Sequence, residues 1–211
     1  MDYVKQPMRI EEKSFEIIDE IVKQEHPNYK FNNEFEELVI KRCIHTGADF
    51  DYLYNLKFAN EFEKNIKEAL RTGVTIYTDT KMALSGINKV ALQKLGCEVV
   101  CLVDDEEVKR MAKEEGITRS MAAVKKALRD EKEKVFAFGN APTAIFQLLE
   151  EDFQPKVKAV IGAPVGFVGA SESKQALFES AYPCASALGR KGGSNIAAAI
   201  MNAVMYQLVE R

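Results

Sequence analysis

The sequence predicts an α/β protein in which a parallel β-sheet lies between two layers of helices. Five short runs rich in β-branched or aromatic residues occur after Gly73. Helical stretches, with apolar residues at three- and four-residue spacing, separate these runs from one another. The first 72 residues show helical spacing alone, which predicts a helical segment ahead of the sheet.

Three helices are expected in this N-terminal segment. The first follows Pro7, and the second follows the pair Asn32-Asn33, whose side chains suit a helix N-cap. The third has an apolar stripe over residues 58–70 and ends at Gly73. We expect the segment to pack on the sheet or on a partner subunit.

The expected strands cover residues 74–78, 99–103, 135–138, 157–161 and 184–188. The expected helices cover residues 79–96, 105–130 with a break at Gly116, 142–151, 171–180 and 193–209. Strands that alternate with helices imply right-handed crossovers and parallel pairing. We therefore predict a three-layer, flavodoxin-like fold with a five-stranded parallel sheet. Residues 1–211 are expected to form one domain, with a helical part (1–72) and a sheet part (73–211).

The composition argues against several classes of protein. Apolar residues make up 46% and charged residues 29% of the chain, which is typical of soluble globular proteins, and no apolar stretch approaches the roughly 20 residues that cross a membrane. The N-terminus lacks the pattern of a secretory signal, so a cytoplasmic location is expected. A net charge of −3 without a clustered basic tract argues against nucleic acid as a partner. The four cysteines lack zinc-site spacing, so no metal is expected.

Polar and glycine-rich segments follow four of the expected strands, at the edge where parallel sheets bind ligands. These segments are Asp79-Thr80, Gly139 to Thr143, Gly162 to Ala170 and Gly189 to Ser194. The second leads into a helix whose backbone N–H groups suit an anion, with Asn140 and Thr143 as candidate binding side chains. The glycine spacings match no nucleotide-binding fingerprint. Turn geometry alone would also account for these glycines.

The chain has two histidines, so an imidazole acid or base that works near neutral pH must be His26 or His45. His26 precedes Pro27 in an expected loop and suits a solvated surface residue. Helical spacing places Arg42 and His45 on one edge of their helix, which makes His45 the candidate general acid. The alternative is a helix-capping histidine beside a solvated arginine.

Three cations form a second candidate group. Arg190 and Lys191 lie among glycines at an expected helix start, where backbone N–H groups add to the positive field. Arg119 starts another helical stretch. Each cation alone is more often a surface charge, but together they favour a ligand with several acidic arms.

Five motifs occur in an order that resembles one family, over about Ile10 to Met205. They are Arg42 to Asp49, Thr118-Arg119-Ser120, Phe138 to Ala144, Pro164 to Lys174, and Gly189 to Ser194. The ordered set and the Pro164 to Lys174 stretch are specific, and they resemble the precorrin-8X methylmutase family.

The resemblance implies a homodimeric isomerase of cobalamin biosynthesis that needs no cofactor. Such an enzyme moves a methyl group from carbon 11 to carbon 12 of precorrin-8X or cobalt-precorrin-8, giving hydrogenobyrinic or cobyrinic acid. His45 would then protonate the tetrapyrrole. The substrate contacts implied by the resemblance, together with those in the loops named above, are Ser14, Arg42, Arg119, Asn140, Thr143, Arg190, Lys191, Gly192, Gly193 and Ser194.

Two other classes fit parts of the sequence. A methyltransferase that uses S-adenosylmethionine should have a glycine-rich loop after its first strand, where this chain has Thr78 to Lys81. It should also have an acidic residue at the end of its second strand, which Asp104 and Asp105 partly match. A non-catalytic protein that binds a corrinoid or a flavin is the other alternative.

Overall fold

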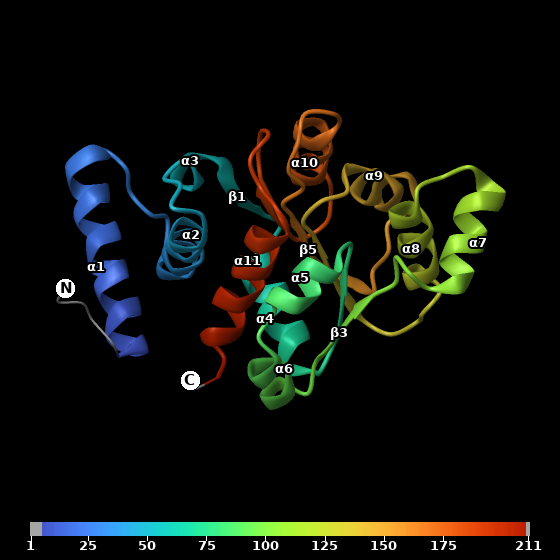
Figure 1. Ribbon diagram of the computed structural model, residues 1–211, viewed down its shortest axis with the longest axis horizontal. Helices are drawn as coiled ribbons and strands as arrows, with labels where there is room; N and C mark the ends of the chain where they lie inside the picture. The colour runs from blue at the N-terminus through green and yellow to red at the C-terminus, as the bar shows by residue number, and fades with distance from the viewer. Residues whose placement is uncertain (1–5, 210–211) are drawn as a thin grey trace.

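A computed structural model of the protein describes residues 6–209 (Figure 1). Residues 1–5, which belong to the N-terminus expected to lack a secretory signal, and residues 210–211 lie outside the described part. Within residues 6–209, no helix is both long enough and apolar enough to cross a membrane.

One sheet of six strands runs through the molecule. The strands are β1 (Leu56–Ala59), β2 (Thr75–Thr78), β3 (Glu98–Cys101), β4 (Lys134–Phe138), β5 (Val157–Gly162) and β6 (Cys184–Ala187). Their order across the sheet is β1-β6-β5-β4-β2-β3. Strands β2 to β6 pair in parallel, whereas β1 runs antiparallel to β6 with Leu56 opposite Ala187. The expected five-stranded, wholly parallel sheet is therefore wrong, because the sheet is mixed and has a sixth strand.

The helices lie before, between and after the strands. They are α1 (Pro7–Glu25), α2 (Glu34–Gly47), α3 (Tyr52–Asn55), α4 (Phe62–Arg71), α5 (Lys81–Gly86), α6 (Lys89–Leu95), α7 (Glu106–Glu115), α8 (Arg119–Leu128), α9 (Pro142–Glu150), α10 (Ala170–Glu179) and α11 (Ser194–Tyr206). The single helix expected over residues 79–96 is two helices. Asn88 separates them, since its side chain caps α6 by accepting the N–H of Ala91 at 3.0 Å.

The extra strand overlaps the start of the apolar stripe that predicted the third helix. Phe58 of β1 and Phe62 of α4 are four residues apart, so the apolar pattern continues across the boundary. Between them, Asn60 and Glu61 have positive φ angles of 54° and 55°, which turn the chain from strand to helix. The Asn60 amide donates to the carbonyl oxygen of Ser180 at 2.8 Å and holds this turn in place.

Helices cover both faces of the sheet. In β4, the buried Val135 and Ala137 face the layer that contains α2, α4 and α11. The alternating Phe136 and Phe138 face the layer that contains α8, α9 and α10. The sheet is thus the middle of three layers.

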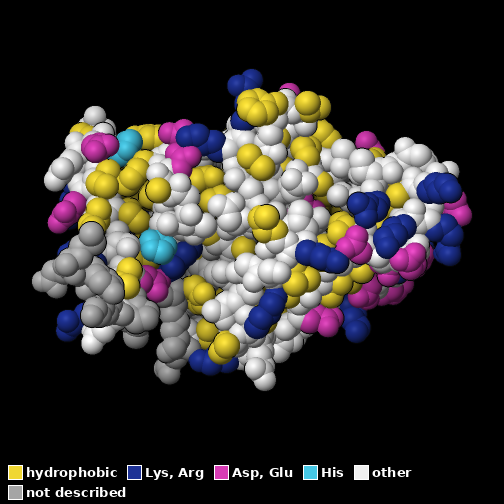
Figure 2. Space-filling view, in the orientation of Figure 1, with side chains coloured by type: hydrophobic (Ala, Val, Ile, Leu, Met, Phe, Trp, Pro, Cys, Tyr) yellow, Lys and Arg dark blue, Asp and Glu magenta, His cyan; other side chains and the backbone are white. Residues whose placement is uncertain are grey.

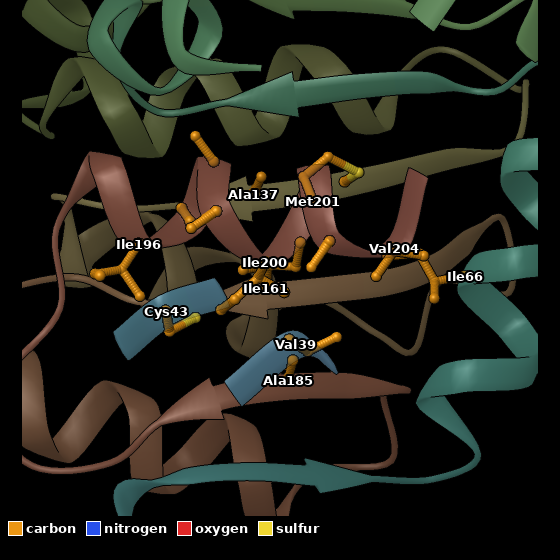
Figure 3. Packing of buried hydrophobic residues seen from close by; sticks show 14 of the residues in the cluster. Val39, Cys43, Ile66, Ala137, Ile161, Ala185, Ile196, Ile200, Met201 and Val204 are labelled. Atoms are coloured by element: carbon orange, nitrogen blue, oxygen red, sulfur yellow. The ribbon is translucent and has the colours of Figure 1, made fainter. Parts of the chain in front are cut away.

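Helix α11 forms the centre of the first layer, and ten of its thirteen residues are buried. Figure 3 shows its apolar side chains among those of α2, α4 and the central strands. The residues labelled there are Val39, Cys43, Ile66, Ala137, Ile161, Ala185, Ile196, Ile200, Met201 and Val204. Because α2 packs on α11, the end of α2 is fixed relative to the sheet. Helix α1 lies outside α2 at one end of the molecule (Figure 1).

Candidate functional site

The carboxylate of Asp79 joins the loop after β2 to the loop after β4. It accepts the backbone N–H groups of Gly139, Asn140 and Ala141 at 2.9, 2.7 and 2.6 Å. Burial raises the pKa of Asp79, and the three N–H groups oppose that rise. The backbone donors that the sequence offers to a ligand anion are thus occupied by the protein's own carboxylate.

Gly193 and Ser194 join the loop after β6 to the same edge of the sheet. The N–H of Gly193 donates to the carbonyl oxygen of Ala163 at 2.7 Å, and the Ser194 hydroxyl lies 2.7 Å from that of Thr80. Position 192 requires glycine, because a Cβ there would lie 2.3 Å from the Ala163 oxygen. The segments that follow β2, β4, β5 and β6 therefore meet at one edge.

The starts of α8 and α9 lie side by side at this edge. The hydroxyl of Thr118, which caps α8, is 3.0 Å from the hydroxyl of Thr143. The next residue, Arg119, is exposed and donates to Asp104 at 3.2 Å. Two of the sequence candidates, Arg119 and Thr143, are thus brought together through Thr118.

The other cations are only partly open to a ligand. Lys191 pairs with Asp49 and Asp51 at 2.8 and 2.6 Å, and both carboxylates raise its pKa. The guanidinium of Arg190 lies 5.8 Å from the centroid of the Phe167 ring, and within residues 6–209 it forms no ion pair. Of the cations that the sequence suggests in this loop, Arg190 is therefore the one more open to an acidic ligand.

The last turn of α2 carries the candidate acid. His45 is exposed, and its ring stacks on that of Phe15 in α1, with centroids 5.5 Å apart and planes inclined by 13°. The guanidinium of Arg42 lies 4.9 Å from the centroid of the same phenyl ring and pairs with Glu11. The cation and the titratable ring thus contact one aromatic side chain.

Two further candidates have local partners. The half-buried Ser14 donates its hydroxyl to the carbonyl oxygen of Ile10 at 2.7 Å, which is the usual bond of a serine within a helix. His26 is also half-buried: its ring stacks on Phe50, and its Nδ1 lies 3.0 Å from the Tyr54 hydroxyl. His26 thus lies at the surface, as expected, but it is not freely solvated, because Phe50 and Tyr54 pack against its ring.

A pocket of about 610 Å³ lies beside Phe15 and Arg42, between α1, α2 and α11. It is lined by Glu11, Glu12, Phe15, Leu38, Arg42, Ala203, Tyr206 and Gln207. Figure 2 shows both histidines at the surface, at the end of the molecule that α1 and α2 form, and shows Lys and Arg spread across the same face. The pocket offers an apolar wall next to the stacked imidazole.

The end of α2 and the loops after the strands lie on one side of the molecule. A Cβ at Gly47 would lie 3.7 Å from Ile196, so α2 ends beside the start of α11. The pairing of Lys191 with Asp49 is a second link between the two regions. This side therefore presents an exposed imidazole and separate cations, which suits a broad anionic ligand that must accept a proton.

Sequence reasoning gave no role of its own to Lys174, which was noted only within a motif. The side chain is fully buried in α10, and its ammonium donates to the carbonyl oxygen of Lys191 at 2.7 Å. Burial lowers its pKa to about 8. The sequence could have predicted its burial, because Lys174 shares one face of the helix with the apolar Ala170 and Leu177.

The cysteines are free thiols in the structure, and Cys43 and Cys184 are buried. Burial raises the pKa of both thiols, which makes them less reactive. In the part of the chain that the structure describes, no three His, Cys, Asp or Glu side chains are grouped so that they could hold a metal ion.

Proteins of one known family are similar to this chain along nearly its whole length. The family model of precorrin-8X methylmutase matches residues 9–207. The cobalt-precorrin-8 methylmutase of Salmonella typhimurium is 53% identical over 211 residues, which is 100% of both chains. The precorrin-8X methylmutase of a Sinorhizobium species is 38% identical over 207 residues, which is 96% of each chain.

A solved structure agrees as well. The precorrin-8X methylmutase from Thermus thermophilus superposes with a TM-score of 0.81 and 35% sequence identity, over 93% of this chain and 95% of that one. The ordered motifs, the fold and these relatives lead to one conclusion: the chain belongs to the precorrin-8X methylmutase family, a family of isomerases.

Proposed function

We propose that this protein moves a methyl group from carbon 11 to carbon 12 of precorrin-8X or cobalt-precorrin-8, giving hydrogenobyrinic or cobyrinic acid. Family membership over residues 9–207 supports the reaction. The observation that carries the mechanism is the exposed imidazole of His45, stacked on Phe15 at the side where the cations lie.

His45 acts as the general acid in this mechanism. A methyl shift between neighbouring ring carbons transfers no electrons to a partner and needs no protein nucleophile. Protonation of the conjugated ring makes the rearranged product accessible, and one imidazole can supply that proton. Phe15 fixes the plane of the imidazole, and Arg42 adds positive charge beside it.

The carboxylate arms of the substrate bind to the cations and polar loops of the same side. Arg190 can bind a carboxylate arm directly. Arg119 and Lys191 must first release the aspartates with which they pair and then bind an arm in their place. The further proposed contacts are Ser14, Arg42, Asn140, Thr143, Gly192, Gly193 and Ser194. No cofactor takes part in this scheme.

Substitution of His45 tests the proposal. We expect His45→Ala to slow single-turnover conversion about 10²- to 10⁴-fold, the usual contribution of a general acid, and to leave product affinity nearly unchanged. His26→Ala is the matched control and should convert substrate at the normal rate. Melting temperature, corrinoid absorbance titration and single-turnover rate should be measured on both variants. A destabilised but fully active His45→Ala protein would contradict the role as acid.

The two alternative classes are separated by the same assay. A methyltransferase would require S-adenosylmethionine and would raise the product mass by one methyl group. A non-catalytic corrinoid carrier would bind the substrate without changing it. The methylmutase should convert precorrin-8X to an isomer of equal mass without any added donor.

We further propose that the protein is a single domain over residues 1–211 and acts in the cytoplasm as a homodimer. The packing of α2 on α11 supports the single domain. Apolar side chains exposed on α1 and α2 support the dimer, since Ile10, Ile17 and Leu38 are 46%, 45% and 40% exposed.

A further inference from the structure

We infer that Asp79 and Thr80 are positioning residues that set the start of α9 against the start of α11. Asp79 is buried, with 5% of its surface exposed, and Thr80 is half-buried. Both residues therefore act through the groups to which they are hydrogen-bonded. The inference rests on the proposed function, because Asn140, Thr143 and Ser194 would contact the substrate's acidic arms.

Asp79 caps α9 from a neighbouring strand. The N-cap residue of α9, Ala141, has no side chain that could accept a hydrogen bond. One Asp79 oxygen accepts the N–H of Gly139, and the other accepts those of Asn140 and Ala141. Three successive backbone groups are thereby fixed, and the exposed side chain of Asn140 projects from a held backbone.

Thr80 holds the start of α11 in a similar way. Its hydroxyl oxygen accepts the N–H of Ala83, which caps α5, and lies 2.7 Å from the Ser194 hydroxyl. The N-cap residue of α11 is Gly193, which likewise has no side-chain cap. Thr80 therefore links the start of α11 to the chain that leaves β2.

The two held segments also touch each other. A Cβ added to Gly139 would lie 2.5 Å from the Cα of Ser194, so the two backbones are in direct contact. A shift of the α9 start therefore displaces Ser194, and the reverse also holds. His45 lies on α2, and within residues 6–209 neither Asp79 nor Thr80 forms a hydrogen bond to that helix, so we expect the affinity to respond to these changes more than the rate does.

Substitution of Asp79 is the first test. In Asp79→Asn, the amide nitrogen must replace one of the two oxygens, so at least one N–H group of residues 139–141 faces another donor. We expect the dissociation constant of hydrogenobyrinic acid to rise about tenfold, which corresponds to the loss of one charge-assisted bond between Asn140 or Thr143 and an acidic arm. The single-turnover rate at saturating substrate should stay within about twofold.

Asp130→Asn is the matched control for this change. Asp130 also accepts a backbone N–H, that of Lys132 at 3.0 Å, but it precedes β4, at the end opposite Gly139. The control should lose stability without losing affinity. Equal affinity losses in both variants, or none in Asp79→Asn, would overturn the inference.

Thr80 provides an independent pair that also serves if Asp79→Asn does not fold. Thr80→Val keeps the shape but removes the hydroxyl, so it should weaken product binding with little change in the single-turnover rate. Thr80→Ser keeps the hydroxyl and should restore the affinity. A purely structural role predicts that both variants, once folded, bind the product as tightly as the unaltered protein does, and this result would overturn the positioning role.

Amide hydrogen exchange separates this inference from the proposed function. Exchange at residues 139–141 should accelerate in Asp79→Asn whether or not a corrinoid binds. Unchanged exchange in Asp79→Asn, with normal turnover by the unaltered protein, would overturn the positioning role of Asp79 and leave the proposed function unaffected. Absence of both corrinoid binding and turnover in the unaltered protein overturns the proposed function, and the positioning role with it.

Discussion

At the scale of single residues, Lys174 is an ammonium group that folding removes from water. Its hydrogen bond goes to the Lys191 carbonyl, and no carboxylate of the described chain pairs with it. Burial therefore lowers its pKa from 10.5 to about 8. The folded protein binds this proton less tightly than the unfolded chain does, which links its stability to pH.

This linkage predicts a pH-dependent difference between the protein and Lys174→Met. Between pH 8 and 10.5 the unfolded chain keeps a proton that the folded protein has released, so stability rises with pH in that window and is lost as pH falls through about 8. The limiting slope is about 1.4 kcal/mol per pH unit. In denaturant unfolding between pH 8 and 10, the difference in stability between the protein and the variant should change with this slope. Parallel curves would contradict the shifted pKa.

Arg119 is the residue on which the proposed binding of a carboxylate arm is most directly testable. Arg119→Ala should weaken corrinoid binding by about 1.5 to 3 kcal/mol, the range for a charge-assisted hydrogen bond, and should leave folding intact. Because Asp104 already pairs with Arg119, Asp104→Asn should not weaken binding. Arg110→Ala, an exposed arginine of α7, is the control. An unchanged dissociation constant in Arg119→Ala would make it an ordinary surface charge.

At the scale of elements, local patterns predicted the helix that carries His45, and long-range contacts decided the rest. The Asn32-Asn33 pair predicted the start of α2, and the i, i+3 spacing predicted that Arg42 lies beside His45. Strand β1 was missed because it lies between two helices, and its Phe58 continues the apolar spacing of α4. The bonds of Asp79 span about sixty residues of sequence, so no local pattern could reveal them.

The start of α2 gives a stability prediction that separates two adjacent asparagines. Asn33 accepts the backbone N–H of Glu36 at 2.8 Å, whereas Asn32 donates to the Glu36 side chain. Asn33→Ala should therefore lower the unfolding free energy by about 1 kcal/mol, and Asn32→Ala by clearly less. Urea unfolding of both variants measures the difference. Equal losses would mean that Asn33 is not the cap.

At the scale of the whole molecule, the sheet gathers polar groups at one edge while α1 and α2 bring the exposed imidazole of His45 to the same side. The packing of the interior holds these two groups on the same side. Helix α11 packs against the sheet on one side and against α2 on the other, so it transmits the position of the sheet to the turn that carries His45 (Figure 3). Helix α1 then supplies Phe15 from outside α2.

The position of α1 leads to the last prediction, which concerns assembly. It buries Ile18 and Val22 toward the core, yet it leaves Ile10 and Ile17 about half exposed at the end of the molecule. A second copy would cover these side chains, so we expect a two-fold homodimer with the N-terminal helices in or near its interface. Ile17→Glu should weaken the dimer in sedimentation at micromolar concentration, because a charge would be buried there. Val90→Glu, on the exposed face of α6, is the matched control. A monomeric protein, or equal dissociation of both variants, would contradict this arrangement.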